Sequence, residues 1–131
     1  MIRLDDRVTA AAALVGRLLL AALFIVEGVS KMRDYGEAVE YMEAYSVPTL
    51  LLPLVILLEV GAGALLAIGW QARLSALALA VFCVLTALLF HFDFDNRGQV
   101  LHFEKNFAIA GGLLAFFAFG PGRWSLDARG G

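Results

Sequence analysis

Four long apolar stretches, separated by short polar segments, dominate the chain. They cover about residues 9–30, 49–69, 73–92 and 101–120. Each is close to the roughly 20 residues that an α-helix needs to cross a ~30 Å hydrocarbon core. The pattern predicts an all-α protein, an integral membrane four-helix bundle, with residues 1–131 forming a single membrane domain.

The fourth stretch is the least regular of the four. Residues 107–119 are apolar but few for a full span, and an extension back to residue 101 brings in four polar side chains: His102, Glu104, Lys105 and Asn106. We favour a full helix whose polar first turns lie inside the bundle. The alternative is a shallow helix that starts among the lipid head groups.

The longest polar connection, residues 31–47, has an amphipathic pattern of its own. Four residues share one helical face: Tyr35, Ala38, Met42 and Tyr45. Pro48 then disfavours helical geometry at Val47. These features predict a short interfacial helix between the first and second spans.

The composition supports a membrane protein. Hydrophobic residues make up 61% of the chain, charged residues make up 17%, and the mean hydropathy is +0.81. A soluble domain carries about 45–50% apolar and about 25% charged residues. The net charge of −2, with no basic stripe or zinc-finger spacing, predicts no nucleic-acid partner. The single cysteine, Cys83, excludes an internal disulfide, and we interpret it as a small buried hydrophobe.

Basic residues suggest an orientation in the membrane. Four spans place both termini on one side, which holds Arg3, Arg7, Arg73, Arg123 and Arg129. The other side holds Lys31, Arg33, Arg97 and Lys105. This small excess predicts a multi-pass protein of a bacterial-type inner membrane with both termini cytoplasmic. Because Arg17 interrupts the first stretch and no clear cleavage site follows it, we interpret that stretch as a retained helix.

Glu59 is the strongest candidate for a functional residue, because it lies in the middle of the second stretch. A charged side chain at the bilayer centre costs about 2.5–3.5 kcal/mol on insertion scales. Arg17, Lys31 and Lys105 are the available cationic partners. One hypothesis is a buried Arg17–Glu59 ion pair that fixes helix register. The other is a polar pocket, in which Glu27 also pairs with Lys31 four residues along the helix.

Two histidines lie toward the outer membrane surface. His91 and His102 are eleven residues apart and do not form a metal motif such as His-Glu-x-x-His. We therefore predict no metal site and treat both as candidate ligand contacts.

Several motifs together resemble the DoxX/DoxD-like membrane proteins. The resemblance covers about residues 14–127 and lies in these segments: Gly16-Arg17-Leu18-Leu19-Leu20 with Gly28-x-x-Lys31, Leu58-Glu59-Val60-Gly61-Ala62-Gly63 with Gly69, Phe90-His91 with Gln99, Phe103, Lys105 and Asn106, Gly111-Gly112, and Gly120-Pro121-Gly122-Arg123-Trp124-Ser125-Leu126-Asp127. Ala62 stands where a second glycine is common in the family. The family's polar positions match Arg17, Lys31, Glu59, His91 and Lys105.

The resemblance implies a four-helix inner-membrane bundle and two classes of function. Some relatives are subunits of a thiosulfate:quinone oxidoreductase, others are linked to oxidative-stress complexes with a superoxide dismutase and a sulfurtransferase, and many have no known role. The first hypothesis is therefore the membrane subunit of a quinone-linked redox complex. Its catalytic candidates are Glu59, Arg17 and Lys105, and its candidate quinone contacts are Lys31, His91, His102 and Gln99.

In that hypothesis electrons arrive from a soluble or membrane redox partner, or directly from a substrate, and the enzyme activity of the chain itself stays open. The alternative is a non-catalytic membrane scaffold or anchor for a soluble enzyme. Either form could assemble as a homo-oligomer. A carrier or proton path is a weaker alternative, because four spans show no evident inverted repeat.

Overall fold

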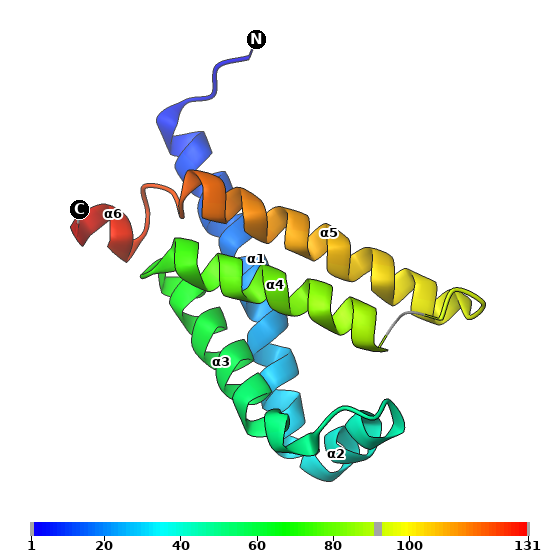
Figure 1. Ribbon diagram of the computed structural model, residues 1–131. Coiled ribbons are helices and arrows are strands. Elements are labelled where there is room, and N and C mark those ends of the chain that lie inside the picture. The colour runs from blue at the N-terminus through cyan, green and yellow to red at the C-terminus, as the bar shows by residue number, and fades with distance from the viewer. Residues whose placement is uncertain (1, 91–92, 131) are drawn as a thin grey trace.

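Helices account for all the regular structure in residues 2–90 and 93–130, which the computed structural model describes. In chain order these are α1 (Asp6–Arg33), α2 (Tyr35–Ala44), the 3-10 helix η1 (Thr49–Leu51), α3 (Leu52–Ile68), α4 (Ala72–Phe90), α5 (Arg97–Phe119) and α6 (Leu126–Gly130) (Figure 1). Four segments are long and apolar enough to cross a membrane: α1, η1 continued by α3, α4 and α5. The predicted all-α class is confirmed.

The polar part of the fourth stretch lies within a continuous helix. The Asn96 side chain accepts hydrogen bonds from the backbone N–H groups of Gly98 (2.9 Å) and Gln99 (3.4 Å), which caps the start of α5. From there α5 continues without a break to Phe119. The depth of its first turns in the membrane stays a prediction.

Helix α2 lies between the first two spans, and its sequence explains its orientation. Met42 is buried, whereas Glu37, Glu40 and Glu43 are exposed. The helix therefore turns one apolar face toward the rest of the protein. Its position at the membrane surface stays a prediction.

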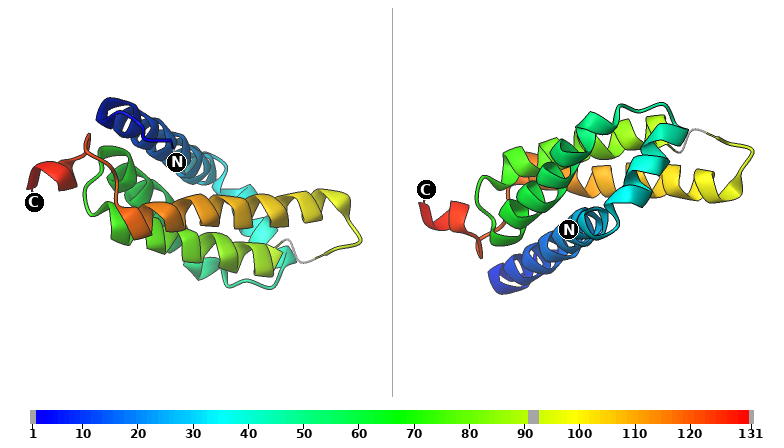
Figure 2. Two further views of the ribbon diagram at one scale, coloured as in Figure 1. Left: turned by 90° about the horizontal axis from the view of Figure 1, so that it is seen from above. Right: turned by 90° about the horizontal axis from the view of Figure 1, so that it is seen from below.

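The spans pack as two pairs, α1 with α3 and α4 with α5. The pairs meet at one end, where the turn between α3 and α4 lies, and diverge toward the other end, where α2 lies (Figures 1 and 2). We call these the closed end and the open end. The core near the closed end contains many small side chains, including Ala21, Ala62, Ala72, Ala76, Ala80 and Ala110. Small residues permit the close helix contacts on which packing in lipid depends.

Two glycines bring α1 and α3 together. A Cβ atom on Gly28 would lie 2.6 Å from Val60 Cγ2 and 3.1 Å from Glu59 Cβ. A Cβ atom on Gly63 would lie 3.0 Å from Ile25 Cγ1. The absence of a side chain at Gly28 therefore sets the spacing of the two helices beside Glu59.

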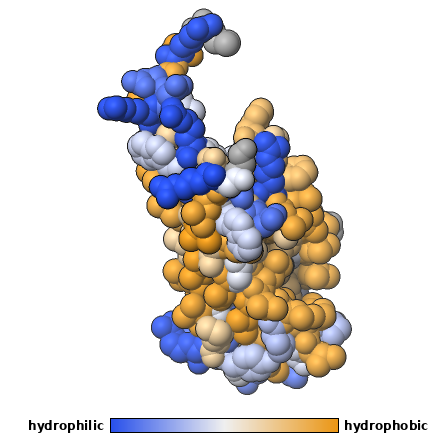
Figure 3. Space-filling model, turned by 90° about the vertical axis from the view of Figure 1, so that its left-hand side faces the viewer, coloured by the Kyte–Doolittle hydropathy of each residue, from blue (hydrophilic) through white to orange (hydrophobic). Residues whose placement is uncertain are grey.

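The surface carries the pattern expected of a protein in a bilayer. On the face shown in Figure 3, apolar side chains cover the middle of the molecule, and hydrophilic side chains gather at its two ends. Large apolar residues are exposed on every long helix, for example Leu19, Leu57, Leu74 and Phe117. An exposed apolar surface of this extent fits a hydrocarbon environment.

Candidate functional site

Lys31 is the ionic partner of Glu59. Lys31 Nζ lies 2.9 Å from Glu59 Oε1, and the two side chains are 30% and 2% exposed. The close α1–α3 contact at Gly28 places Lys31, almost one turn further along α1, beside the carboxylate. The hypothesis of an Arg17–Glu59 ion pair is wrong, because Arg17 binds elsewhere.

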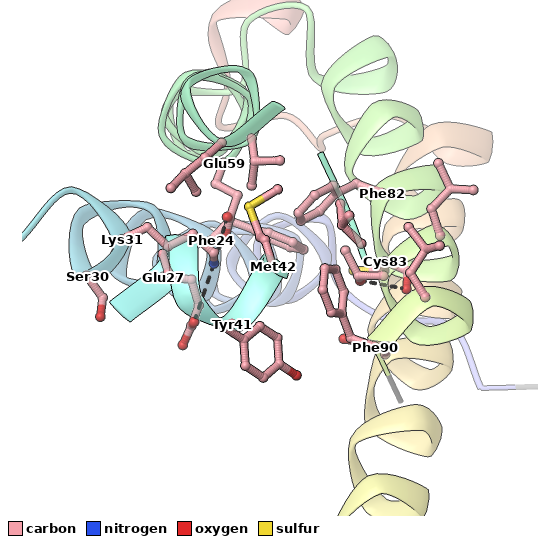
Figure 4. A pocket seen from close by; sticks show the side chains of 18 of the residues that line it. Phe24, Glu27, Ser30, Lys31, Tyr41, Met42, Glu59, Phe82, Cys83 and Phe90 are labelled. Carbon is pink, nitrogen blue, oxygen red and sulfur yellow. Dashed lines mark hydrogen bonds and ion pairs between the residues drawn. The ribbon is translucent and has the colours of Figure 1, made fainter. Parts of the chain in front are cut away.

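A second carboxylate extends this pair toward solvent. Glu27 Oε2 lies 3.9 Å from Lys31 Nζ, so the pairing expected from their spacing on α1 is confirmed, and the Glu27 side chain is 56% exposed. The ammonium group therefore lies between an exposed and a buried carboxylate (Figure 4). Glu27, Lys31 and Glu59 therefore form a row of charged side chains that runs from the protein surface to the middle of α3.

Glu59 retains hydrogen-bonding capacity in spite of its ion pair. Its Oε1 atom lies 2.9 Å from the Lys31 ammonium, a distance at which this contact occupies one ammonium donor and only part of the acceptor capacity of the carboxylate. An ammonium group has three donors. Donor and acceptor positions are thus available around this pair.

The Lys31–Glu59 pair lies in the wall of a cavity of about 820 Å³ at the open end. Its polar lining comes mainly from α1, α3 and α5: Glu27, Lys31, Glu59, His102, Lys105 and Asn106. Aromatic rings contribute much of the rest, from Phe24, Tyr41, Phe82 and Phe90 (Figure 4). Sites for small molecules have volumes of roughly 300–1,000 Å³ and combine apolar walls with a few polar groups.

An aromatic bridge joins α2 to the second helix pair at the open end. The rings of Tyr41 and Phe90 stack with centroids 5.2 Å apart, and Tyr45 meets Phe90 edge-on at 5.2 Å. The Gln99 side chain donates a hydrogen bond to the Tyr45 hydroxyl (3.1 Å). Burial, with a smaller effect of Tyr45, raises the pKa of Tyr41 to about 12. The Tyr41 phenol beside the cavity therefore remains a hydrogen-bond donor at neutral pH.

The structure brings only some of the predicted site residues together. Glu59, Lys31, His102 and Lys105 line the cavity. Gln99 supports the aromatic bridge and does not line the cavity. His91 lies outside the described residues. Within residues 2–90 and 93–130 there is no group of three or more His, Cys, Asp or Glu side chains that could hold a metal ion.

Arg17 belongs to a different site at the closed end. Arg17 is 1% exposed, and its guanidinium group donates hydrogen bonds to three backbone carbonyls. Nη1 donates to Pro121 O (2.6 Å), Nη2 donates to Trp124 O (2.9 Å), and both Nε (3.4 Å) and Nη2 (3.3 Å) reach Ala67 O. Arg17 thereby ties α1 to the end of α3 and to the segment after α5.

Residues 120–127, which we call the clasp, are fixed on the turn between α3 and α4. The Asp127 carboxylate accepts hydrogen bonds from the backbone N–H groups of Gln71 and Ala72, each at 2.8 Å, and Asp127 N donates to Gly69 O (2.8 Å). Gly69 has φ +72°, and a Cβ there would lie 2.4 Å from Ser125 Cβ. The clasp and the cavity therefore lie at opposite ends of the bundle.

Sequence reasoning did not identify the clasp because the acceptors of Arg17 are backbone carbonyls. A signal was nevertheless present in Gly120 and Gly122 around Pro121. Both glycines have positive φ (85° and 94°), a conformation that other residues rarely adopt. They turn the chain back toward α1 directly after the last span.

Comparison with known proteins agrees with this architecture. The sequence model of the DoxX family matches residues 12–92. The chain is 46% identical to the inner membrane protein YqjF of Escherichia coli K12, with 87% of this chain and 88% of that protein covered. It is 32% identical to the inner membrane protein YphA of the same organism, with 88% of each chain covered. No solved structure matches the chain. These similarities, on a four-helix structure, show that the chain belongs to the DoxX family.

Proposed function

We propose that this protein is an inner-membrane subunit of a redox complex and binds a lipid-soluble quinone in the cavity beside Lys31 and Glu59. The observation that carries the proposal is the buried ion pair in the wall of a largely apolar cavity. Ionisable groups inside a membrane protein commonly mark a ligand or proton site. The relatives YqjF and YphA, both inner membrane proteins by name, support the location.

The residues around the ion pair fit the head of a quinone. The Lys31 ammonium can donate to a quinone carbonyl while it stays in contact with Glu59. The carboxylates of Glu59 and Glu27 can accept hydrogen bonds from the hydroxyls of a quinol. Aromatic and apolar walls suit the ring. One site therefore offers partners to both forms of the ligand.

A bound quinone would supply the redox chemistry, since it takes up two electrons and two protons to become a quinol. The chain's own residues position the head and supply carboxylates on the proton side: Glu27 at the surface and Glu59 in the interior. We expect the electrons to come from a partner protein or from the substrate of the complex.

Glu59→Gln is expected to weaken quinone binding about tenfold. The amide cannot hold the Lys31 ammonium ionically, and a tenfold loss corresponds to about 1.4 kcal/mol. Binding is measured by native mass spectrometry on protein in lipid nanodiscs titrated with a quinone. Glu40→Gln is the matched control, because Glu40 is exposed on α2 and does not line the cavity. Equal affinity of Glu59→Gln and the unmodified protein would contradict the proposal.

A membrane anchor for a soluble enzyme is the second candidate function. Exposed carboxylates of α2 and of the segment before α5 lie toward the open end: Glu37, Glu40, Glu43, Asp93 and Asp95. Such a surface suits a basic partner. A purified protein that binds no quinone but retains a stoichiometric soluble enzyme would favour this candidate.

We further propose that both termini are cytoplasmic. The clasp, the α3–α4 turn and the start of α1 lie at one end of the bundle, where Arg123 Nη1 lies 3.6 Å from Asp6 Oδ2 (Figure 1). Green fluorescent protein fused after Gly131 should fluoresce, and alkaline phosphatase fused there should be inactive. Phosphatase inserted between Asp95 and Asn96 should be active. The opposite pattern would reverse the orientation.

A further inference from the structure

The two sides of the cavity differ in chemistry. The contacts between helices place the spans around the bundle in the order α1, α3, α4, α5, which leaves one side between α1 and α5 and another between α3 and α4. The α1–α5 side carries the polar lining residues Glu27, Lys31, His102, Lys105 and Asn106. Apart from Glu59 and Thr86, the lining residues on the side of η1, α3 and α4 are apolar or aromatic: Leu51, Leu52, Val55, Phe82, Cys83, Leu85, Leu89 and Phe90.

The apolar side is open to the surface. Leu51, Leu85 and Leu89 line the cavity and are nevertheless 43%, 52% and 54% exposed. Helices α3 and α4 meet at the closed end and separate toward the open end (Figure 1). These leucines therefore form the rim of an opening, which we call the α3–α4 slot. The three leucines of its rim are uncharged, and they lie on the apolar part of the surface that fits a hydrocarbon environment.

We propose that the α3–α4 slot is the exit for the hydrocarbon tail of the ligand whose head lies beside Lys31 and Glu59. This inference rests on the proposed function and names its substrate class as quinones with a long tail. A tail that left between α1 and α5 would instead pass charged groups, including Glu27, Lys31 and Lys105. Contact with hydrocarbon would strip water from these groups, which is unfavourable.

The slot also explains how a lipid-soluble ligand reaches an ion pair inside the bundle. The head enters laterally between α3 and α4, and the tail remains partly in the surrounding lipid. Leu51, Val55 and Leu85 then determine which tails pass. A ring without a tail contacts the walls of the cavity but gains nothing from these residues.

The test compares one quinone ring with and without a long isoprenoid tail. Leu85→Trp and Leu51→Trp, on opposite rims, narrow the slot and should lower the affinity for the tailed quinone about tenfold, with the tail-free quinone unchanged. Leu88→Trp and Leu54→Trp are matched controls, because both leucines are exposed on the same two spans and do not line the cavity. The controls should leave both affinities unchanged. Each ligand partitions into the lipid to the same extent for every variant, so partition does not affect the comparison between variants.

The outcomes separate this inference from the proposed function. If quinone binds but the slot variants lower the affinity for both ligands equally, or for neither, the proposed exit through the slot is wrong. The quinone site itself would remain in place. Absence of binding for both quinones would overturn the proposed function and the slot with it. A photoreactive group on the tail should label α3 or α4, and labelling of α1 or α5 would overturn the slot without any substitution in the protein.

Discussion

Arg17→Met is expected to destabilise the folded protein by about 3–5 kcal/mol, the largest effect of any single substitution that we consider. Hydrogen bonds to a charged group contribute about 1.5–3 kcal/mol each, and Arg17 donates to three separate carbonyls. Methionine fills a similar volume but leaves Ala67 O, Pro121 O and Trp124 O without this donor. The clasp should then detach from the α3–α4 turn.

The measurement is the free energy of unfolding of purified protein in detergent micelles, followed by circular dichroism. Arg73→Met is the matched control, because Arg73 is exposed at the same end and donates one hydrogen bond, to Ala118 O (3.2 Å). The control should change stability by less than about 1 kcal/mol. Similar effects of the two substitutions would show that Arg17 does not hold the clasp.

Lys31→Met should destabilise the protein by about 3 kcal/mol, more than Glu59→Gln, although both substitutions break the same ion pair. Loss of one partner of a buried pair costs about 3–5 kcal/mol because the other charge is left uncompensated. After Lys31→Met that charge is Glu59, which is 2% exposed and must stay unpaired or take up a proton. After Glu59→Gln the remaining charge is Lys31, which is 30% exposed and still has Glu27.

The double substitution Lys31→Met with Glu59→Gln tests whether the uncompensated charge of Glu59 causes the loss of stability in Lys31→Met. It removes both charges, so it should recover part of the stability lost in Lys31→Met alone. Lys105→Met is the control, because Lys105 lines the cavity but is exposed on α5. If Glu59→Gln proves more damaging than Lys31→Met, the assignment of Lys31 as the partner of Glu59 is incorrect.

The membrane-spanning helices could be predicted from the sequence because each one is specified locally. Apolar length decides where a helix crosses lipid. The predicted fourth stretch, residues 101–120, nevertheless begins later than α5, which starts at Arg97, because the first turns of α5 are polar. The short helix after α1 has a recognisable apolar face for the same reason. None of these predictions depends on which helices are neighbours in the fold.

The partners of the buried charges could not be predicted in the same way. Charge alone made Arg17, Lys31 and Lys105 equal candidates for Glu59. The choice depends on Gly28, which lets α1 approach α3 just before Lys31, and on the carbonyls that occupy Arg17. Backbone acceptors are present at every residue, so a sequence does not show which of them will face a guanidinium group.

The position of the Arg17 acceptors also has a consequence for biosynthesis. Arg17 enters the membrane with the first helix, whereas Pro121 and Trp124 follow 104 and 107 residues later in the chain. Until they are translated, the first span carries a cation without its final acceptors, which is costly in hydrocarbon. The clasp can therefore close on Arg17 only after all four spans have been translated.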